Sequence, residues 1–567
     1  MISFFQKRIK SLITFFTLIF FSISAFAFSP LDPFLWPDPN FQPKLDLIKY
    51  KHFKKPRGAY SVEGQLAKRI TFKGAPSQRK FKISEDSLEM NKNFKVLDVF
   101  PSFSLDILIK DSKAIPVNQS VRSTQNLNWD IQFGSGQSWI DDFGNTRSSI
   151  PFALVQKNQN CVHNGVMVFD FDFDGQISNI LYQIAAETCS YFKFDLIGII
   201  QAESVNDIEF SETDFLFYVE SQNSITSVSN INKLDEKKNF GSPKEVSPEH
   251  LTVYGFHDGS THHRSLCKTR SGNYPYCNAM LLPSFSLAKS LVATMSLALL
   301  EKDYPNIMNE NIQDHVPACK QKKWKDVRFK HALNMATGHY FDKKWYSEDW
   351  YLNNKGFSLN YTHKDRIKFA CSVFSKKSPP GVKLSYHSSD TYILGVGLNN
   401  FYKSKNGDNA DIYKDLILPL WKQLNLSQAT YEIRRSIDFI RHPYMEYGMF
   451  MTADDVLKIG AFFMEQNELT EKGVLADALQ SNANQRGLTA IENILYYNNG
   501  FWAKKFKGSG LNCAEDVWIP FMSGFGGITV AFMPNQTMYY YFSDNQEYSW
   551  DRAVNASNRM SPFCKSN

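Results

Sequence analysis

A change in residue pattern near the middle of the chain constrains its fold most strongly. From about Tyr60 to Val219 apolar and polar residues alternate in short runs such as Phe169 to Asp174, a pattern typical of half-buried β-strands. A polar segment rich in Ser, Asn and Lys follows, from Ser221 to Glu249, and indicates a linker. The sequence has 567 residues, which is more than one domain usually holds, so we expect two domains.

The part that follows this segment mixes strands and helices. Leu251 to Phe256 resembles a strand. Two further strand-like segments, Ile528 to Met533 and Met538 to Ser543, flank the turn sequence Pro534-Asn535-Gln536-Thr537 and predict a hairpin. Between them, Thr452 can cap a helix that has acidic residues in its first turn. Strands at both ends with helices between them predict an α+β fold, an antiparallel sheet flanked by helices. We therefore predict a mainly β domain of unknown role over residues 28–245 and an α+β domain over residues 250–567.

The first 27 residues have the features of a secretory signal peptide. Lys7, Arg8 and Lys10 precede an apolar stretch from Leu12 to Ile23, which is short for a membrane span. Ala25-Phe26-Ala27 matches the small-x-small cleavage pattern, so we expect cleavage after Ala27 and a periplasmic or secreted protein. The alternative is an uncleaved anchor.

The eight cysteines that follow the signal form an even set, which in an exported protein indicates disulfides. Cys161–Cys189 and Cys267–Cys277 would close short loops, but the spacing does not fix the pairing. The absence of a Cys-x-x-Cys pair argues against a zinc or redox motif. The cysteines are Cys161, Cys189, Cys267, Cys277, Cys319, Cys371, Cys513 and Cys564.

Charge and hydropathy exclude two classes of partner. The net charge is only +6 and the basic residues form no long run, so no nucleic-acid partner is expected. No segment after the signal is long and apolar enough to cross a membrane, so we expect no membrane span after cleavage.

The segment that begins near Ser284 carries the strongest chemical signal. Apolar residues recur every four positions from Leu287 to Leu299 and predict an amphipathic helix, with Ser286 in its first turn and Lys289 on the same face. A serine hydroxyl needs a base to become a nucleophile, and a desolvated, neutral lysine can be that base. The N–H groups at the start of the helix could hold an oxyanion. Taken alone, Ser-x-x-Lys is common, and the alternative is a polar first turn on a core helix.

Further segments in the same order give the sequence a family resemblance. Ser284 to Ser290 (SFSLAKS) resembles the nucleophile motif of class C beta-lactamase-like hydrolases, within the serine beta-lactamases and penicillin-binding proteins. It is especially similar to the branch of aminohexanoate-oligomer hydrolases and related esterases. The resemblance covers about residues 250–567 and implies a beta-lactamase/transpeptidase-like fold. It also rests on FKHALNMATG at 329–338, KLSYHSSDTYILG at 383–395, MFMTADDVLKIGAFF at 449–463 and FMSGFGGITVAFMP at 521–534.

The resemblance implies roles for residues of the second and third motifs. Tyr386 takes the place of the family's tyrosine, which accepts a proton and later donates one to the leaving group, and Ser388 stands where many members have Asn. The third motif, on what the resemblance implies is the edge strand of the sheet, has Ser523 and Gly524 where penicillin-binding enzymes have Thr and Gly after a lysine. Phe525 would supply the second oxyanion N–H, and Gly527 would allow the backbone to approach the acyl group. The missing lysine argues against a beta-lactam or peptide carboxylate as ligand.

Two other polar clusters could suggest metal binding. Asp170 to Gly175 matches the first half of a calcium loop, but Leu181 replaces the glutamate of its twelfth position. His257, Asp258, His262 and His263 fit no ligand spacing that is typical of a metal site, and a solvated turn is the expectation. We therefore predict no metal and no cofactor.

Together these features predict an exported serine hydrolase that cleaves an amide or ester through an acyl-enzyme on Ser286, with Lys289 and Tyr386 as acid and base. Its substrate would be a small molecule or a peptide. Two alternatives stay open: a cell-wall D,D-peptidase or beta-lactamase, and a catalytically silent exported binding module. The sequence leaves the oligomeric state open.

Overall fold

The computed structural model describes residues 29–564, apart from residues 39, 41–42, 73–79, 206–225, 343, 355 and 485–486. The predicted signal peptide and its cleavage after Ala27 lie outside the described residues. Within those residues, no helix has both the length and the apolar character that crossing a membrane requires.

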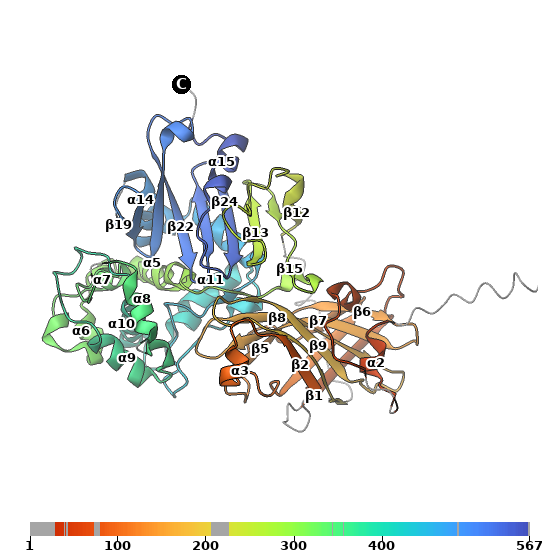
Figure 1. The fold of residues 1–567 in the computed structure, drawn as a ribbon. Coiled ribbons are helices and arrows are strands. Elements are labelled where there is room, and N and C mark those ends of the chain that lie inside the picture. The colour runs from red at the N-terminus through yellow and green to blue at the C-terminus, as the bar shows by residue number, and fades with distance from the viewer. Residues whose placement is uncertain are drawn as a thin grey trace, which may run out of the picture.

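The first part of the chain forms one broad antiparallel sheet. Its strands follow the order β11-β1-β3-β4-β6-β7-β8-β9-β10-β2, and β5 pairs with β7 outside this path. In Figure 1 this sheet is the orange and yellow layer at lower right. The strands are β1 (Gln65–Phe72), β2 (Lys80–Glu85), β3 (Phe103–Lys110), β4 (Lys113–Pro116), β5 (Trp129–Phe133), β6 (Gly136–Ile140), β7 (Thr146–Gln156), β8 (Val162–Phe171), β9 (Ile180–Thr188), β10 (Asp195–Ile200) and β11 (Ala202–Val205).

The central strands of this sheet are covered on both faces. Every residue of β8 and β9 is buried, whereas β11, at one end of the sheet, alternates between half-buried and exposed. Strands that are buried on both sides need apolar residues at successive positions, and β10 has such a run, Leu196 to Ile200. Short helical turns accompany the sheet: α2 (Asp32–Leu35), η1 (Tyr50–Phe53) and α3 (Met90–Phe94).

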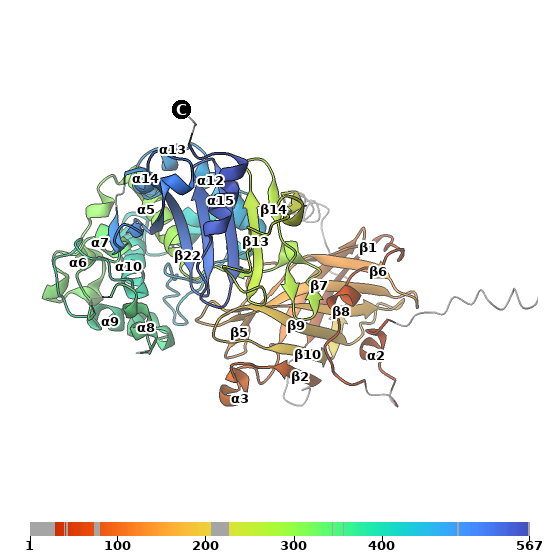
Figure 2. The same cartoon turned by 45° about the horizontal axis from the view of Figure 1, so that its top comes forward.

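A second sheet is built from the rest of the chain, in the order β12-β14-β13-β24-β23-β22-β21-β20-β19. All neighbouring pairs are antiparallel except β12 with β14. Figure 2 shows it standing above the first sheet. Its strands are β12 (Val228–Asn230), β13 (Leu251–His257), β14 (His262–Arg264), β19 (Leu488–Ile491), β20 (Leu495–Asn498), β21 (Phe501–Phe506), β22 (Val517–Gly524), β23 (Ile528–Met533) and β24 (Thr537–Ser543).

Side chains of this second sheet alternate between two apolar layers, as the pleat of a strand requires. One face, including Met522 and Phe532, packs with the helices α5, α12 and α14. The other face, including Phe521 and Tyr539, packs with Trp550 and α15. The helices of this part are α5 (Met295–Asp303), α6 (Ile312–His315), α7 (Phe329–Leu333), α8 (Ser347–Asn354), α9 (His363–Ser372), α10 (Ser388–Asn406), α11 (Leu418–Gln423), α12 (Ala453–Met464), α13 (Glu468–Glu471), α14 (Val474–Asn484) and α15 (Asp551–Met560).

The architecture confirms the predicted α+β class, an antiparallel sheet with helices preceded by a mainly β part. The hairpin predicted near the C-terminus forms β23 and β24, and Thr452 caps α12 in a capping box with Asp455. The predicted place of the third motif at a sheet edge is wrong. β22 lies inside the sheet, between β21 and β23, because further strands continue beyond β21.

Two other predictions need correction. The polar segment Ser221 to Glu249 is not a free linker over its described residues, 226–249, because β12 pairs with β14 and Phe240 and Val246 are buried in the second sheet's core. The histidine cluster is a solvated turn only in part, because residues 258–260 form an exposed turn and the histidines that follow do not. His262 and His263 lie buried in β14, where His262 contacts the Tyr540 hydroxyl at 2.9 Å.

The cysteines form four disulfides. The two predicted pairs, Cys161–Cys189 and Cys267–Cys277, are confirmed. The other two pairs, Cys319–Cys371 and Cys513–Cys564, brace the helical group and the C-terminal end.

Candidate active site

Ser286 follows a short strand that fixes its backbone. β17 (Leu282–Pro283) pairs with β18 (Phe450–Met451), and the chain then turns through Phe285, whose φ of 41° is in the left-handed region. That conformation is strained for a bulky residue and persists where the surroundings enforce it. Ser286 is half-buried, between this turn and the helix that begins at Leu287.

Asn160, from the loop between β7 and β8, holds this turn. Its Oδ1 accepts hydrogen bonds from the Phe285 N–H at 2.5 Å and from the Gly448 N–H at 3.3 Å. The Ser284 hydroxyl lies 3.3 Å from the same oxygen. A residue of the first sheet's loop therefore positions the serine of the second part.

The helix after Ser286 is wider than predicted. Residues Lys289–Thr294 form a π-helix, and the regular helix α5 begins only at Met295. The Thr294 hydroxyl contacts the Lys289 carbonyl at 3.1 Å and the Asn499 carbonyl at 2.7 Å. Such π segments are rare in proteins overall, but those that occur are often found at functional sites.

The lysine side chain reaches back to the serine, as its i+3 spacing predicts. Lys289 Nζ lies 2.9 Å from Ser286 Oγ, 3.0 Å from Ser388 Oγ and 3.3 Å from the Glu446 carbonyl oxygen. The three hydrogen-bond contacts fix the amine directly beside the hydroxyl.

Burial shifts the acidity of this amine. Lys289 is 2% exposed, and desolvation lowers its pKa below the usual value, because a buried ammonium loses its hydration. The carboxylates of Asp349 and Glu446 act in the opposite direction. The net effect favours a neutral amine, which can accept a proton.

Tyr386 completes the group around the serine. Its interaction with the Ser286 side chain acts to lower its pKa, its ring centroid lies 5.0 Å from Lys289 Nζ, and its ring stacks on Trp502 at 5.5 Å. Burial, followed by the negative charge of Asp349, raises the pKa of Tyr386 well above its usual value. Tyr386 is therefore a neutral phenol at rest.

Asp349 in α8 was not predicted from the sequence. Its carboxylate accepts hydrogen bonds from the Ser388 N–H at 2.5 Å and the Ser388 hydroxyl at 3.0 Å. It thereby orients the hydroxyl that touches Lys289. No sequence signal marks Asp349, because the acid lies 39 residues before its partner and belongs to no motif.

The turn between β22 and β23 lies close to the serine segment. A Cβ on Gly524 would come within 2.8 Å of the Ser284 carbonyl oxygen, and the Phe525 ring lies 5.7 Å from that of Phe285. Within the described part of the chain, neither the Ser286 N–H nor the Phe525 N–H donates a backbone hydrogen bond. Two free donors thus stand on adjoining segments.

The remaining predicted residues lie on the same hairpin. Ser523 pairs with Thr529 across β22 and β23. Gly527 has a φ of 97°, and a Cβ there would meet the Ser543 hydroxyl at 2.4 Å. The tight turn therefore requires a glycine at position 527.

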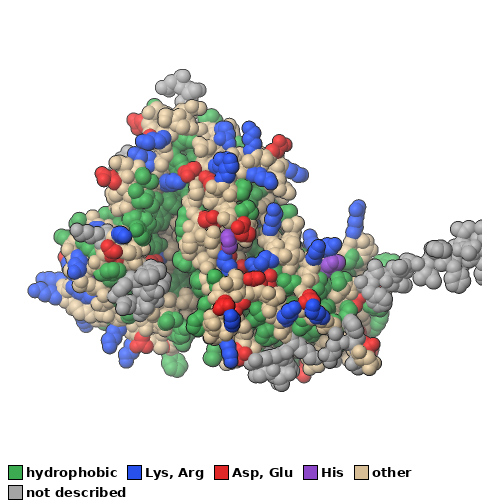
Figure 3. Space-filling view, viewed as in Figure 1, with side chains coloured by type: hydrophobic (Ala, Val, Ile, Leu, Met, Phe, Trp, Pro, Cys, Tyr) green, Lys and Arg blue, Asp and Glu red, His purple; other side chains and the backbone are tan. Residues whose placement is uncertain are grey.

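The surface is hollowed between the helices at left, α7 to α10, and the strands at the centre, with hydrophobic side chains along the hollow (Figure 3). Near the serine the aromatic side chains of Trp345, Trp502 and Tyr386 pack together, with Trp345 and Trp502 centroids 5.2 Å apart. An acyl group that reached Ser286 would meet an aromatic wall.

Two clusters weighed as metal sites have other partners. Asp170 pairs with Arg147 at 2.8 Å, and Asp172 accepts backbone hydrogen bonds from Asp174 and Gln176. His263 lies 2.9 Å from Asp258. Among the described residues, no group of three or more His, Cys, Asp or Glu side chains could hold a metal ion.

Several solved structures are similar to this chain in fold. One is described as a 6-aminohexanoate-dimer hydrolase from Bacillus anthracis and is 12% identical. The match covers 59% of this chain and 87% of that one, with a TM-score of 0.43. A penicillin-binding protein homologue from Caulobacter crescentus has 13% identity over 60% of this chain and 99% of that one, with a TM-score of 0.41. A class C beta-lactamase in complex with cefoxitin is 12% identical. The match covers 60% of this chain and 97% of that one, with a TM-score of 0.38.

No family model matches the sequence, and no curated protein does. At these identities and TM-scores the likeness to solved structures assigns no residue and no substrate. What the site can do therefore depends on its own geometry: a half-buried serine, a desolvated amine within hydrogen-bond distance of it, and a neutral phenol whose ring lies beside the amine.

Proposed function

We propose that this chain is an exported serine hydrolase that cleaves an amide or ester through an acyl-enzyme on Ser286. The observation that carries the proposal is the 2.9 Å contact between Lys289 Nζ and Ser286 Oγ, made by a lysine that is 2% exposed. A nucleophile and a base within hydrogen-bond distance, with the base oriented by a third group, are the requirement for covalent catalysis.

In the first step, the Ser286 proton passes to the neutral amine of Lys289 as Oγ attacks the carbonyl carbon of the substrate. The oxyanion that forms accepts hydrogen bonds from the N–H groups of Ser286 and Phe525, which are free for this role. Removing one such donor typically costs about 10²–10³ in kcat in other hydrolases.

In the second step, the tetrahedral intermediate expels its leaving group, which takes the proton of Tyr386. The Lys289 ammonium then returns its proton to Tyr386. A water molecule attacks the acyl-enzyme with the same groups acting in reverse, and the acid product and free Ser286 result. The raised pKa keeps Tyr386 protonated at rest, so it cannot begin the reaction as a base but holds the proton that the leaving group needs.

The substrate class follows from the third motif. Met522 occupies the position where penicillin-binding enzymes carry a lysine, and its side chain is buried in the core. The side chain therefore offers no positive charge to a substrate carboxylate, which favours an amide or ester without one. The four disulfides support an oxidising compartment, periplasmic or extracellular.

A fluorophosphonate probe tests this proposal, because it reacts with activated serines. We expect the purified mature chain to be labelled, the Ser286→Ala and Lys289→Met variants to lose labelling, and Ser372→Ala, which changes an exposed serine of α9, to keep it. Labelling of Ser286→Ala at the normal rate would refute the assignment. Stable, Ser286-dependent labelling by a fluorescent penicillin would instead favour a cell-wall peptidase.

A further inference from the structure

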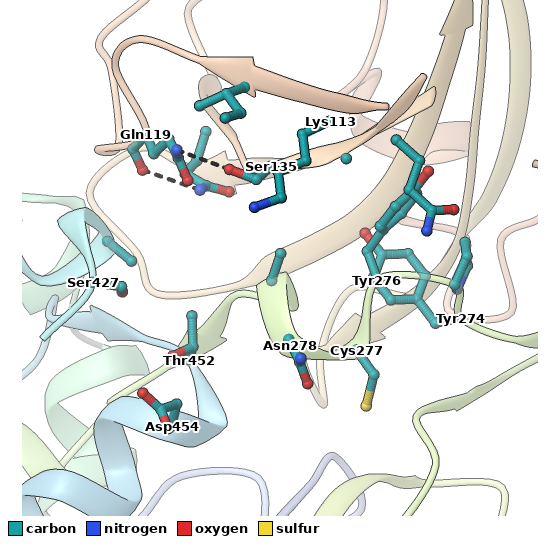
Figure 4. A pocket seen from close by; sticks show the side chains of 18 of the residues that line it. Lys113, Gln119, Ser135, Tyr274, Tyr276, Cys277, Asn278, Ser427, Thr452 and Asp454 are labelled. Atoms are coloured by element: carbon teal, nitrogen blue, oxygen red, sulfur yellow. Dashed lines mark hydrogen bonds between the residues drawn. The ribbon is translucent and has the colours of Figure 1, made fainter. Parts of the chain in front are cut away.

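A second cavity, of about 1340 Å³, lies between the two parts of the chain. Figure 4 shows Lys113, Gln119 and Ser135 approaching it from the first sheet's side, and Ser427, Thr452 and Asp454 from the other side. None of Ser286, Lys289, Tyr386 and Ser388 lines it. The cavity is therefore distinct from the candidate active site.

Positive charge dominates this cavity. Eight basic side chains and two carboxylates line it. One of the carboxylates, Asp454, is already matched by Lys458, whose Nζ lies 2.8 Å away. The amine of Lys55 lies 3.1 Å from the hydroxyls of Ser61 and Ser112. Among the residues that the structure describes, the basic side chains around the cavity outnumber the carboxylates, so their charge would attract anions.

Arg264 is the most informative of these basic residues. It is 9% exposed, its Nη2 donates to Asn278 Oδ1 at 2.8 Å, and its Nε is buried without a hydrogen-bond partner. Among the described residues, it forms no ion pair with a carboxylate, and burial lowers its pKa. A buried guanidinium is costly unless it is paired, so a bound anionic group would satisfy a need that the protein leaves open.

The neutral lining indicates what else the ligand carries. The amides of Gln119, Gln132 and Asn278 line the cavity together with the rings of Tyr274 and Tyr276. Both tyrosine hydroxyls are engaged by backbone carbonyls, at 2.8 Å from Gly165 and from Ser149, so their rings form a fixed wall. Amides suit hydroxyl groups and flat rings suit the apolar faces of sugars. The volume exceeds the roughly 300–1,000 Å³ of ordinary small-ligand sites.

We propose that this cavity binds an acidic oligosaccharide, with one of its anionic groups on Arg264 and others on the lysines, Lys113 among them. Arg264 and Lys113 come from different sheets, so the ligand would bridge the two parts of the molecule. This role does not depend on the hydrolysis proposed for Ser286.

Isothermal titration calorimetry of the mature full-length chain with tetragalacturonate tests the proposal. The fully methyl-esterified tetrasaccharide has the same sugar chain without charge, and inorganic phosphate is the simple anion. We expect saturable binding of tetragalacturonate that weakens as NaCl is raised, because salt screens charge over about 8–10 Å at physiological ionic strength. The ester and phosphate should bind at least about tenfold more weakly, a difference of about 1.4 kcal/mol.

Variants assign the binding to this cavity. Arg264→Gln should weaken tetragalacturonate binding about tenfold or more, and Lys113→Gln, at a half-buried strand residue, by a smaller factor. Lys507→Gln removes the same charge from a side chain that is 79% exposed and outside the cavity, and should leave binding unchanged. Ser286→Ala should also bind normally, so failure here and failure of the hydrolase proposal are separate results.

Three outcomes would overturn the proposal. These are no binding of tetragalacturonate by the wild type, equal binding of phosphate or the neutral ester, and wild-type affinity in both Arg264→Gln and Lys113→Gln. If Arg264→Gln fails to fold, as its melting curve would show, Lys113→Gln alone still decides whether the cavity is the site.

Discussion

At the scale of single residues, burial shifts both acid–base groups toward their uncharged forms. The pKa of the Lys289 amine is lowered and that of the Tyr386 phenol is raised, in each case chiefly by desolvation. Both shifts favour the neutral form. When the Ser286 proton moves to Lys289, the nearby Asp349 carboxylate stabilises the ammonium that results.

Tyr386→Phe should lower kcat by about 10²–10⁴ for substrates with a poor leaving group, because general acid catalysis is lost. A p-nitrophenolate leaves without a proton, so p-nitrophenyl esters should lose much less. The phenylalanine keeps the stacking on Trp502 at 5.5 Å, so the melting temperature should change little. Steady-state kinetics with matched ethyl and p-nitrophenyl esters measures the difference, and equal losses on both esters would contradict the assignment.

Asp349→Asn should move the acidic limb of the pH profile of kcat/KM to lower pH. Lys289 must be neutral to accept the proton, so activity rises as the pH passes its pKa. Since the Asp349 carboxylate raises that pKa, its removal lowers it, and the rise begins at lower pH. Asparagine can still accept the Ser388 N–H bond.

A p-nitrophenyl ester assayed across the pH range gives this profile. Glu515→Gln changes an exposed carboxylate just before β22 begins, and it should leave the pH profile unchanged. A limb that stays in place in Asp349→Asn would show that Lys289 is not the titrating base.

At the scale of structural elements, the serine turn is held by parts of the chain that are distant in sequence. Asn160 precedes Phe285 by 125 residues, and Gly448 lies 288 residues beyond Asn160. One amide oxygen thus ties three segments at the point where the nucleophile is presented. One of its donors is the N–H of Phe285, the residue with the left-handed backbone.

Asn160→Ala should lower the free energy of unfolding by about 1–3 kcal/mol for each buried donor that it leaves unpaired. The rate of fluorophosphonate labelling should fall as well, because the Ser286 turn loses its support. Thermal melting and labelling rates measure the two effects. Gln159→Ala, at the preceding half-buried residue, is the matched control and should resemble the wild type in both.

Local patterns predicted the elements that depend on local physics. The capping box at Thr452 and the hairpin of β23 and β24 follow from residues within a few positions of each other. The Lys289–Ser286 contact likewise follows from helical spacing. Asp349 and Asn160 could not be predicted, because their roles arise from contacts between remote segments. The interior place of β22 was missed because strand order is a property of the whole sheet.

At the scale of the whole molecule, the two parts share one interior. A single cluster of buried apolar side chains includes Trp129 and Phe194 of the first part and Leu291 and Phe401 of the second. Polar contacts cross as well: Arg434 pairs with Asp130 and donates to the Gln156 carbonyl at 2.7 Å. We propose that the two predicted domains, 28–245 and 250–567, fold as one cooperative unit.

A chain that begins at residue 226 should therefore fail as an independent enzyme. It lacks Asn160 and exposes the apolar surface that the first sheet covers, so we expect aggregation or loss of cooperative melting, and no fluorophosphonate labelling. The mature full-length chain, prepared alongside, is the control. Labelling of the truncated protein at the full-length rate would show that the second part is autonomous.

The pairing of the cysteines has a consequence for biogenesis. In each of the four disulfides a cysteine is joined to the next cysteine along the chain, with separations of 28, 10, 52 and 51 residues. A polypeptide that emerges from a translocon N-terminus first would thus present each thiol together with its correct partner before the next pair appears. If the cysteines were oxidised in the order in which they emerge, the four native disulfides would form directly. An oxidase alone would then suffice, and no disulfide would need to be rearranged by an isomerase.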